Sequence, residues 1–168
     1  DIVGDGENIY STGAQNSSYY LYLSGTSMAA PNITGSLYLL QEYYAQKNSG
    51  NFMRAATLKG LACHTAFDAG NVGPDYIYGW GLLDMRKAAQ AITDNGVKSI
   101  IAENTLNQGQ VTKRDIIASG NGPLSVSISW TDPEGIPTTG TTINDRTPKL
   151  VNDLDIRISD GSTTYTPW

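Results

Sequence analysis

The stretch "LSGTSMAAPNITG", Leu23 to Gly35, places Ser27 among small residues at the entrance to a helical pattern. A serine at the start of a helix lies beside unpaired backbone N–H groups and the positive end of the helix dipole. Both features stabilise the negative charge that forms on a carbonyl oxygen when a hydroxyl attacks it. Gly25 frees the backbone and leaves room for a substrate to approach. On spacing alone, however, Ser27 is an equally good helix N-cap.

A seven-residue motif decides between these two interpretations: Gly25-Thr26-Ser27-Met28-Ala29-Ala30-Pro31. It resembles the nucleophile motif of the subtilisin-like serine proteases, the subtilases. Further stretches are similar to the family in the same order, namely "DIV" at 1–3, Gly35, "LKGLACHTA" at 58–66 and "YGWGLLD" at 78–84. The resemblance implies that residues 1–96 are the C-terminal part of a subtilase catalytic domain, which is an α/β domain with a parallel sheet.

The resemblance also implies roles for single residues. Ser27 is expected to be the catalytic nucleophile, and its own backbone N–H is expected to donate to the oxyanion. The hydroxyl of Thr26 is expected to support that site, while Ser24 and Gly25 are candidates for a loop that touches the substrate. The second oxyanion donor of the family is an upstream asparagine, which no residue of this sequence matches.

The sequence departs from the family pattern at two places near the serine. Asn32 stands where many subtilases have histidine, and Gly4-Asp5-Gly6 replaces the usual Ala-Pro-Gly. We therefore expect the loop before the site to be built differently from that of most members.

The catalytic triad is incomplete in this sequence. Subtilases present Asp, His and then Ser along the chain, but residues 1–26 contain no histidine. The one histidine, His64, follows Ser27, and the family uses its position structurally. The α/β-hydrolase nucleophile elbow is excluded, because it needs glycine where Ala29 stands.

The expected function follows from these residues. We expect the chain to be a fragment of a secreted serine endopeptidase that hydrolyses peptide bonds through an acyl-enzyme on Ser27. The triad Asp and His are expected on a missing upstream segment, so the fragment alone is expected to be inactive. The alternative is a non-catalytic binding or structural module.

Helical periodicity predicts three helices in the first half of the chain. Apolar residues over 31–46 recur around most of the circumference, so this helix is expected to be largely buried. Gly35 within it indicates a close packing neighbour. A second helix is predicted over 51–62, and a third begins at Asp84, which is a good N-cap. A short strand is expected at 8–11.

After Gly96 the apolar pattern changes from a period of 3.6 to a period of 2, which predicts a domain boundary. Gly, Asn and Pro clusters separate predicted strands at 98–103, 110–118, 124–131 and 150–159. "VSISWTDPEG" and "LVNDLDIRIS" are similar to the β-sandwich that follows the catalytic domain in one branch of bacterial subtilases. We therefore predict that residues 97–168 form an incomplete antiparallel β-sandwich of the jelly-roll kind.

The composition argues against several partners. The formal net charge is −5, which would repel nucleic acids and anionic membranes. No apolar run approaches the roughly 18 residues of a membrane span. The single cysteine, Cys63, precludes an intrachain disulfide and a thiolate metal site. By resemblance we expect a polypeptide substrate, an extracellular and monomeric intact protein, and no cofactor for the chemistry.

The family resemblance allows calcium, but the sequence assigns no metal ligand. Asp153 and Asp155 share one face of a predicted strand, where two carboxylates would suit a cation. Arg157 lies on the same face, so an exposed, ion-paired surface is the favoured interpretation. Tyr19, Tyr20 and Tyr22 suit either a substrate cleft or packing in the core or at an edge strand, and we favour packing.

Overall fold

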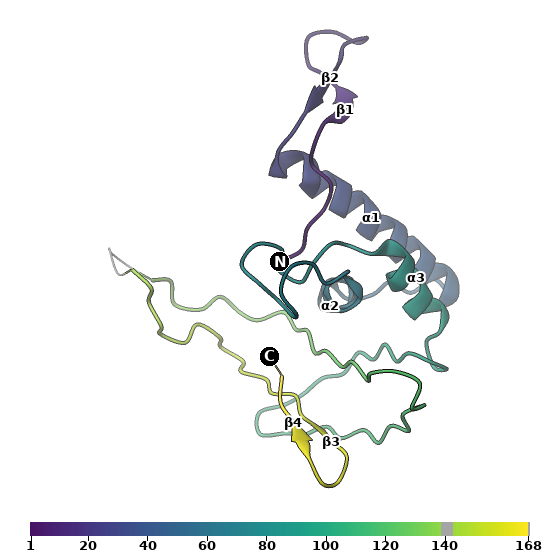
Figure 1. Ribbon diagram of the computed structural model, residues 1–168, viewed down its shortest axis with the longest axis vertical. Helices are drawn as coiled ribbons and strands as arrows, with labels where there is room; N and C mark the ends of the chain where they lie inside the picture. Colours follow the sequence, from purple (N-terminus) through teal and green to yellow (C-terminus); the bar gives the residue numbers. More distant parts are fainter. Residues whose placement is uncertain (139–142, 168) are drawn as a thin grey trace.

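The computed structural model describes residues 1–138 and 143–167. Its helices are α1 (Thr26–Lys47), α2 (Ala55–Thr65) and α3 (Met85–Thr93). An antiparallel hairpin of β1 (Ile9–Thr12) and β2 (Tyr20–Leu23) leads into α1 and projects away from the helices (Figure 1). A second antiparallel hairpin pairs β3 (Ile158–Ser159) with β4 (Thr164–Tyr165) near the C-terminal end. The helices and strands agree with the predicted α/β class at this coarse level.

The hydrophobic core lies where the three helices meet. Its buried members are Leu40 from α1, Met53 from the loop that follows, Leu61 from α2, and Ala88 and Ile92 from α3. These side chains fall on one stripe of each helix, as amphipathic spacing requires. The core therefore positions α1, which carries Ser27 in its first turn.

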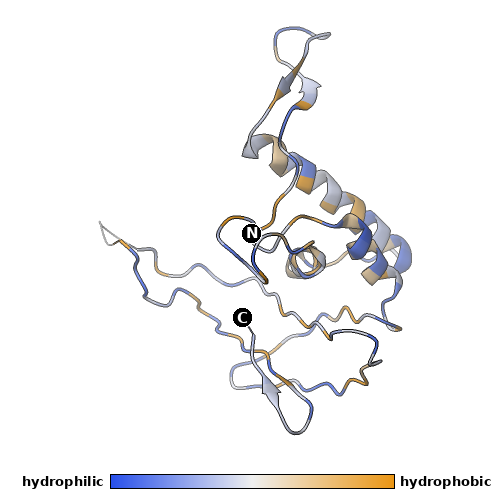
Figure 2. Ribbon diagram, in the orientation of Figure 1, coloured by the Kyte–Doolittle hydropathy of each residue, from blue (hydrophilic) through white to orange (hydrophobic). Residues whose placement is uncertain are grey.

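The prediction that most of the circumference of α1 is buried is wrong. Leu40 is its one buried residue, whereas Tyr38 is 73% and Leu39 62% exposed. The physical reason is that α2 and α3 cover α1 along a single stripe, which accounts for Leu40 and leaves the other apolar positions facing out. Figure 2 shows apolar and polar residues mixed along the length of this helix.

The observed helix boundaries differ from the predicted ones at two of the three starts. α1 begins at Thr26, so Pro31 lies inside the helix and not in its first turn. α2 begins at Ala55, because Arg54 before it is extended, with φ −62° and ψ 155°. α3 begins directly after Asp84, as predicted, and the Asp84 carboxylate accepts a hydrogen bond from the Lys87 backbone N–H at 2.9 Å.

One parallel pairing brings the two ends of the first half together. The N–H of Val3 donates to Gly81 O at 2.9 Å, and the N–H of Leu83 donates to Val3 O at 3.1 Å. Phe67 pairs antiparallel with Leu82 on the other side. Within the described residues this parallel contact is a single bridge, so the wider parallel sheet stays a prediction.

The strands predicted over 98–103, 110–118 and 124–131 are not formed in the structure, and only Ile158–Ser159 of the fourth is a strand. Alternation selects the two faces of a segment, but a strand also needs a neighbour to receive its backbone hydrogen bonds. The apolar face of 124–130 is uncovered, since Leu124 is 45%, Val126 40% and Ile128 42% exposed. The β-sandwich therefore remains a prediction.

Candidate active site

The connection between β2 and α1 determines the direction in which Ser27 is presented. Gly25 precedes the helix with φ 150° and ψ 169°, a backbone conformation that favours glycine. Its N–H donates to Gly6 O at 2.8 Å. The hydroxyl of Ser24 accepts a hydrogen bond from the Asn8 N–H at 2.9 Å, so this side chain fixes the loop before the helix.

The two departures from the family pattern lie against each other. A Cβ added to Gly6 would approach Gly25 O at 2.6 Å and one on Gly4 would approach Ile33 Cδ1 at 2.6 Å, so both glycines allow the loop to pack on α1. Asn32 donates from Nδ2 to Asp5 O at 3.3 Å. Residues 4–6 and Asn32 thus form one contact, which the sequence signalled only by departing at both places.

Ser27 is exposed in the first turn of α1. Within the described part of the chain, neither its hydroxyl nor its backbone N–H makes a hydrogen bond, and the N–H and hydroxyl of Thr26 are also free. The first helical hydrogen bonds begin at Met28, whose N–H donates to Gly25 O at 3.0 Å. Unpaired donors at the positive end of a helix are suited to receiving an oxyanion next to the serine.

Pro31 changes the hydrogen bonding of the Ser27 carbonyl. Inside a helix, residue 31 would donate its N–H to the carbonyl of residue 27, but proline has no N–H to donate. The Ser27 carbonyl therefore lacks its usual helical partner. The first turn of α1 is held instead by hydrogen bonds to Gly25 O and by the contact of Asn32 with the loop.

The one histidine does not lie with the serine. His64 is in the last turn of α2, and its Nδ1 is 2.7 Å from the hydroxyl oxygen of Ser127. Partial burial lowers the pKa of the His64 imidazole below its ordinary value. This histidine is thus paired with a residue of the second half of the chain.

The remaining candidates from the sequence are the possible metal ligands, the single cysteine and the tyrosines of the first hairpin. Among the described residues, no group of three or more His, Cys, Asp and Glu side chains could hold a metal ion. Asp155 lies 3.7 Å from Arg157 and both side chains are exposed, so that face is ion-paired. Burial raises the pKa of the Cys63 thiol. On the hairpin, Tyr10 stacks on Tyr20 with 5.4 Å between ring centres.

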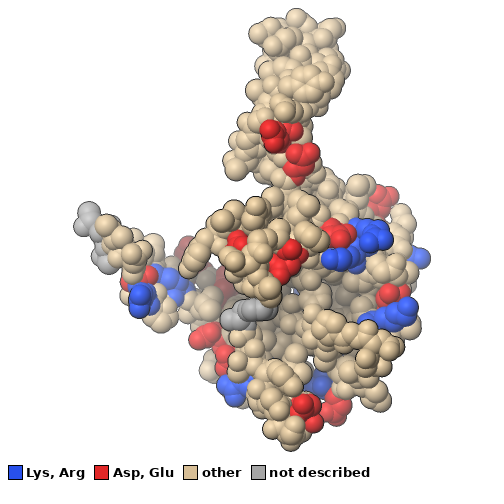
Figure 3. Space-filling model, viewed as in Figure 1, with Lys and Arg blue, Asp and Glu red and all other residues tan. Residues whose placement is uncertain are grey.

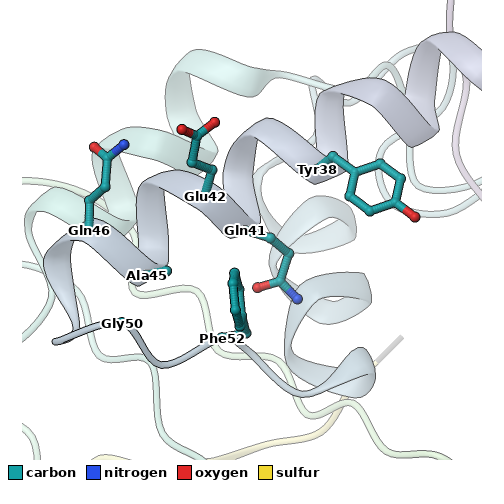
Figure 4. Close-up of a pocket in the computed structure, with 7 residues that line it drawn as sticks. All are labelled: Tyr38, Gln41, Glu42, Ala45, Gln46, Gly50 and Phe52. Carbon is teal, nitrogen blue, oxygen red and sulfur yellow. The ribbon is translucent and has the colours of Figure 1, made fainter.

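A groove on α1 lies away from the serine. It has a volume of about 680 Å³ and is lined by residues from the second half of α1 and from the loop to α2, including Tyr38, Gln41 and Phe52 (Figure 4). Tyr38 is eleven residues beyond Ser27, which corresponds to about 16 Å along a helix. Gln41 is engaged with the backbone of Met53 by two hydrogen bonds of 2.9 Å. This groove is therefore separate from the candidate active site.

The surface carries small, separate groups of charge. On the face shown in Figure 3, acidic and basic side chains of the described residues alternate without a continuous basic patch. None of the helices within 1–138 and 143–167 has the length and apolar character needed to cross a membrane.

Sequence comparison matches the segment that carries the motif, the exposed serine and the helix behind it. Residues 1–81 match the model of the subtilase family, the S8 peptidases. This segment of the chain is therefore similar to the subtilases. The match covers Ser27, the contacting loop at residues 4–6, α1 and α2.

Three curated relatives have similar sequences, and two of them are named as proteases. The chain is 34% identical over 119 residues to the PII-type proteinase of Lactococcus lactis subsp. cremoris, covering 62% of this chain and 6% of the relative. It is 35% identical over 89 residues to an extracellular serine protease of Serratia marcescens, covering 53% and 7%. It is 34% identical over 91 residues to the serotype-specific antigen 1 of Mannheimia haemolytica, covering 54% and 8%. The chain thus spans less than a tenth of the length of these relatives.

Proposed function

We propose that this chain is the nucleophile-bearing part of a secreted serine endopeptidase. The observation that carries the proposal is the exposed Ser27 in the first turn of α1, inside the segment 1–81 that matches the subtilase family model. The Ser27 hydroxyl oxygen attacks the carbonyl carbon of a peptide bond and forms an acyl-enzyme, which water then hydrolyses. The Ser27 N–H donates to the oxyanion.

The general base and its aspartate lie outside these 168 residues in this proposal. His64, the single histidine, is engaged with Ser127 at the far end of α2. A proton leaving Ser27 therefore needs an acceptor from other polypeptide. The 168-residue chain alone is inactive on this account, and Thr26, Ser24 and Gly25 shape the site around the nucleophile.

The remaining parts of the proposal concern the whole protein. Residues 1–96 are assigned to the catalytic domain and residues 97–168 to a β-sandwich, whose strands form when neighbouring strands are present. The extracellular name of the Serratia marcescens relative supports secretion. The substrate is a polypeptide, since two of the relatives are named as proteinases. The family resemblance allows calcium, with ligands that are not assigned.

Peptide hydrolysis by the full-length protein tests this proposal. Ser27→Ala is expected to lower kcat more than about a thousandfold, because no other group replaces the nucleophile. Ser24→Ala is the matched control. It removes a hydroxyl that fixes the loop at Asn8, and it is expected to lower kcat far less than Ser27→Ala does. A Ser27→Ala variant that hydrolyses peptides at the wild-type rate would contradict the role of Ser27, whereas a full-length protein that hydrolyses no peptide would support the binding or structural alternative.

A further inference from the structure

Helix α2 has no cap from its own sequence at its N-terminus. Arg54 occupies the N-cap position and provides no side-chain hydrogen bond to the helix. Glu103, from the segment that follows α3, supplies the missing acceptor. Its Oε1 accepts from the Arg54 N–H at 2.8 Å and from the Thr57 hydroxyl at 2.5 Å, and its Oε2 lies 3.2 Å from the Arg54 Nε.

The chemistry of this contact is that of a helix cap supplied by a distant residue. A carboxylate at a helix N-terminus satisfies free N–H groups and interacts favourably with the helix dipole. Desolvation opposes ionisation of Glu103, yet the hydrogen bonds from Thr57 and Arg54 and the guanidinium charge lower its pKa below the ordinary value. The anionic form of Glu103 is therefore the form that this end of α2 stabilises.

The same helix is contacted again near its C-terminus. His64 Nδ1 lies 2.7 Å from Ser127 Oγ, and a Cβ added to Gly60 would come within 2.7 Å of Ser129 Cβ. Gly60 and His64 are four residues apart, about 6 Å along a helix. Ser127 and Ser129 are two residues apart, about 6.6 Å along an extended chain. The two spacings match, so the serine face of "LSVSISW" lies along α2.

We propose that α2 is the surface on which residues 97–138 are docked, held by Glu103 at its first turn and by Ser127 and Ser129 at its last turns. The helix and this segment then open as one cooperative unit. Since Leu61 of α2 belongs to the core with Leu40 of α1, the docked segment also supports the helix that carries Ser27. The proposal concerns packing and does not depend on the proposed function.

Hydrogen exchange of single backbone amides in the full chain, followed by NMR, tests this proposal. The Arg54 amide is a direct reporter, because Glu103 is its acceptor. Glu103→Ala is expected to lower its protection roughly fivefold or more, as the loss of a helix cap does. Glu103→Gln keeps an acceptor oxygen and is expected to restore most of the protection. Glu134→Ala removes an exposed acid of the same segment and is the matched control.

The decisive result is the effect of each contact on the opposite end of the helix. Ser127→Ala is expected to lower the protection of the Arg54 amide, which lies about 15 Å away along α2. Glu103→Ala is expected to lower the protection of the Thr65 amide in the same way. Ser125→Ala removes a neighbouring hydroxyl from the same face of the segment and is expected to change neither. Effects confined to the mutated end, or equal effects of Ser125→Ala, would overturn the proposal.

Discussion

Several residues close to Ser27 in the sequence are small or lack an N–H group, and Ser27 itself is exposed. Gly25 turns the chain into α1 at a φ of 150°, Ala29 adds only a methyl group two residues after Ser27, and Pro31 has no N–H for the Ser27 carbonyl. Asn32 ties the helix to the loop at Asp5. At the residue scale, the motif therefore specifies backbone geometry as much as it specifies the proposed nucleophile.

Gly25→Ala tests that geometry. A Cβ at this φ is strained, and we expect the substitution to lower the free energy of unfolding by roughly 1–3 kcal/mol. Gly35→Ala is the matched control, because Gly35 is helical and a Cβ there would meet no atom within 4 Å beyond the backbone of its own helix among the described residues. The close packing neighbour predicted for Gly35 is thus wrong. Gly35→Ala is expected to stabilise by about 1 kcal/mol. Urea denaturation measures both, and equal effects of the two substitutions would contradict this account of Gly25.

Asp160 gives a pH dependence at the same scale. Its carboxylate accepts from the N–H groups of Thr163 at 2.7 Å and Ser162 at 2.9 Å, and these bonds lower its pKa to about 2. Its contribution to the β3–β4 turn is therefore complete above about pH 4 and is lost as the pH falls through 2. An NMR titration of the Asp160 carboxyl should show its midpoint near 2, whereas a midpoint near 4 would show that the turn does not hold the anion.

At the scale of the element, helix α3 was the most predictable part of the fold, because a capping aspartate and an apolar stripe coincide in the sequence. The start of α1 was missed, since Pro31 is also common at a first turn. The absent strands at 98–131 depend on partners far along the chain, which periodicity does not encode. The motif predicts Ser27 as the nucleophile, which stays a proposal, whereas the contact between Asn32 and Asp5 could be found only in the structure.

Asp84→Ala tests the cap of α3. The substitution removes the acceptor for the Lys87 N–H, and we expect a loss of about 1 kcal/mol in the free energy of unfolding. Asp94→Ala at the other end removes an acid from beside the negative pole of the helix dipole and is expected to be neutral or slightly stabilising. Thermal denaturation of both variants separates a capping effect from a general effect of lost charge.

The whole molecule depends on a small core between three helices, with many apolar side chains still facing out. Leu40 is 1% exposed and lies in the core, whereas its neighbour Leu39 is 62% exposed on the same helix. Residues of the second half contact this core region through α2, at Glu103 and Ser127. The stability of the turn that carries Ser27 is thus a property of the assembled chain.

Leu40→Ala against Leu39→Ala tests the location of the core. Removal of the buried side chain is expected to lower the free energy of unfolding by roughly 2–5 kcal/mol, because a cavity remains. The same change at Leu39 is expected to stay within about 0.5 kcal/mol. Chemical denaturation gives both values, and a larger loss at Leu39 would mean that α1 buries a different face.

Covalent labelling of the full-length protein with a fluorophosphonate, mapped by peptide mass spectrometry, tests the central claim most directly. The account predicts one phosphonate adduct on the Ser27 hydroxyl oxygen, which Ser27→Ala abolishes and His64→Ala retains. The isolated 168-residue chain should remain unlabelled. An adduct on another residue that persists in Ser27→Ala would contradict the account. Loss of the Ser27 adduct in a folded His64→Ala variant would contradict it as well.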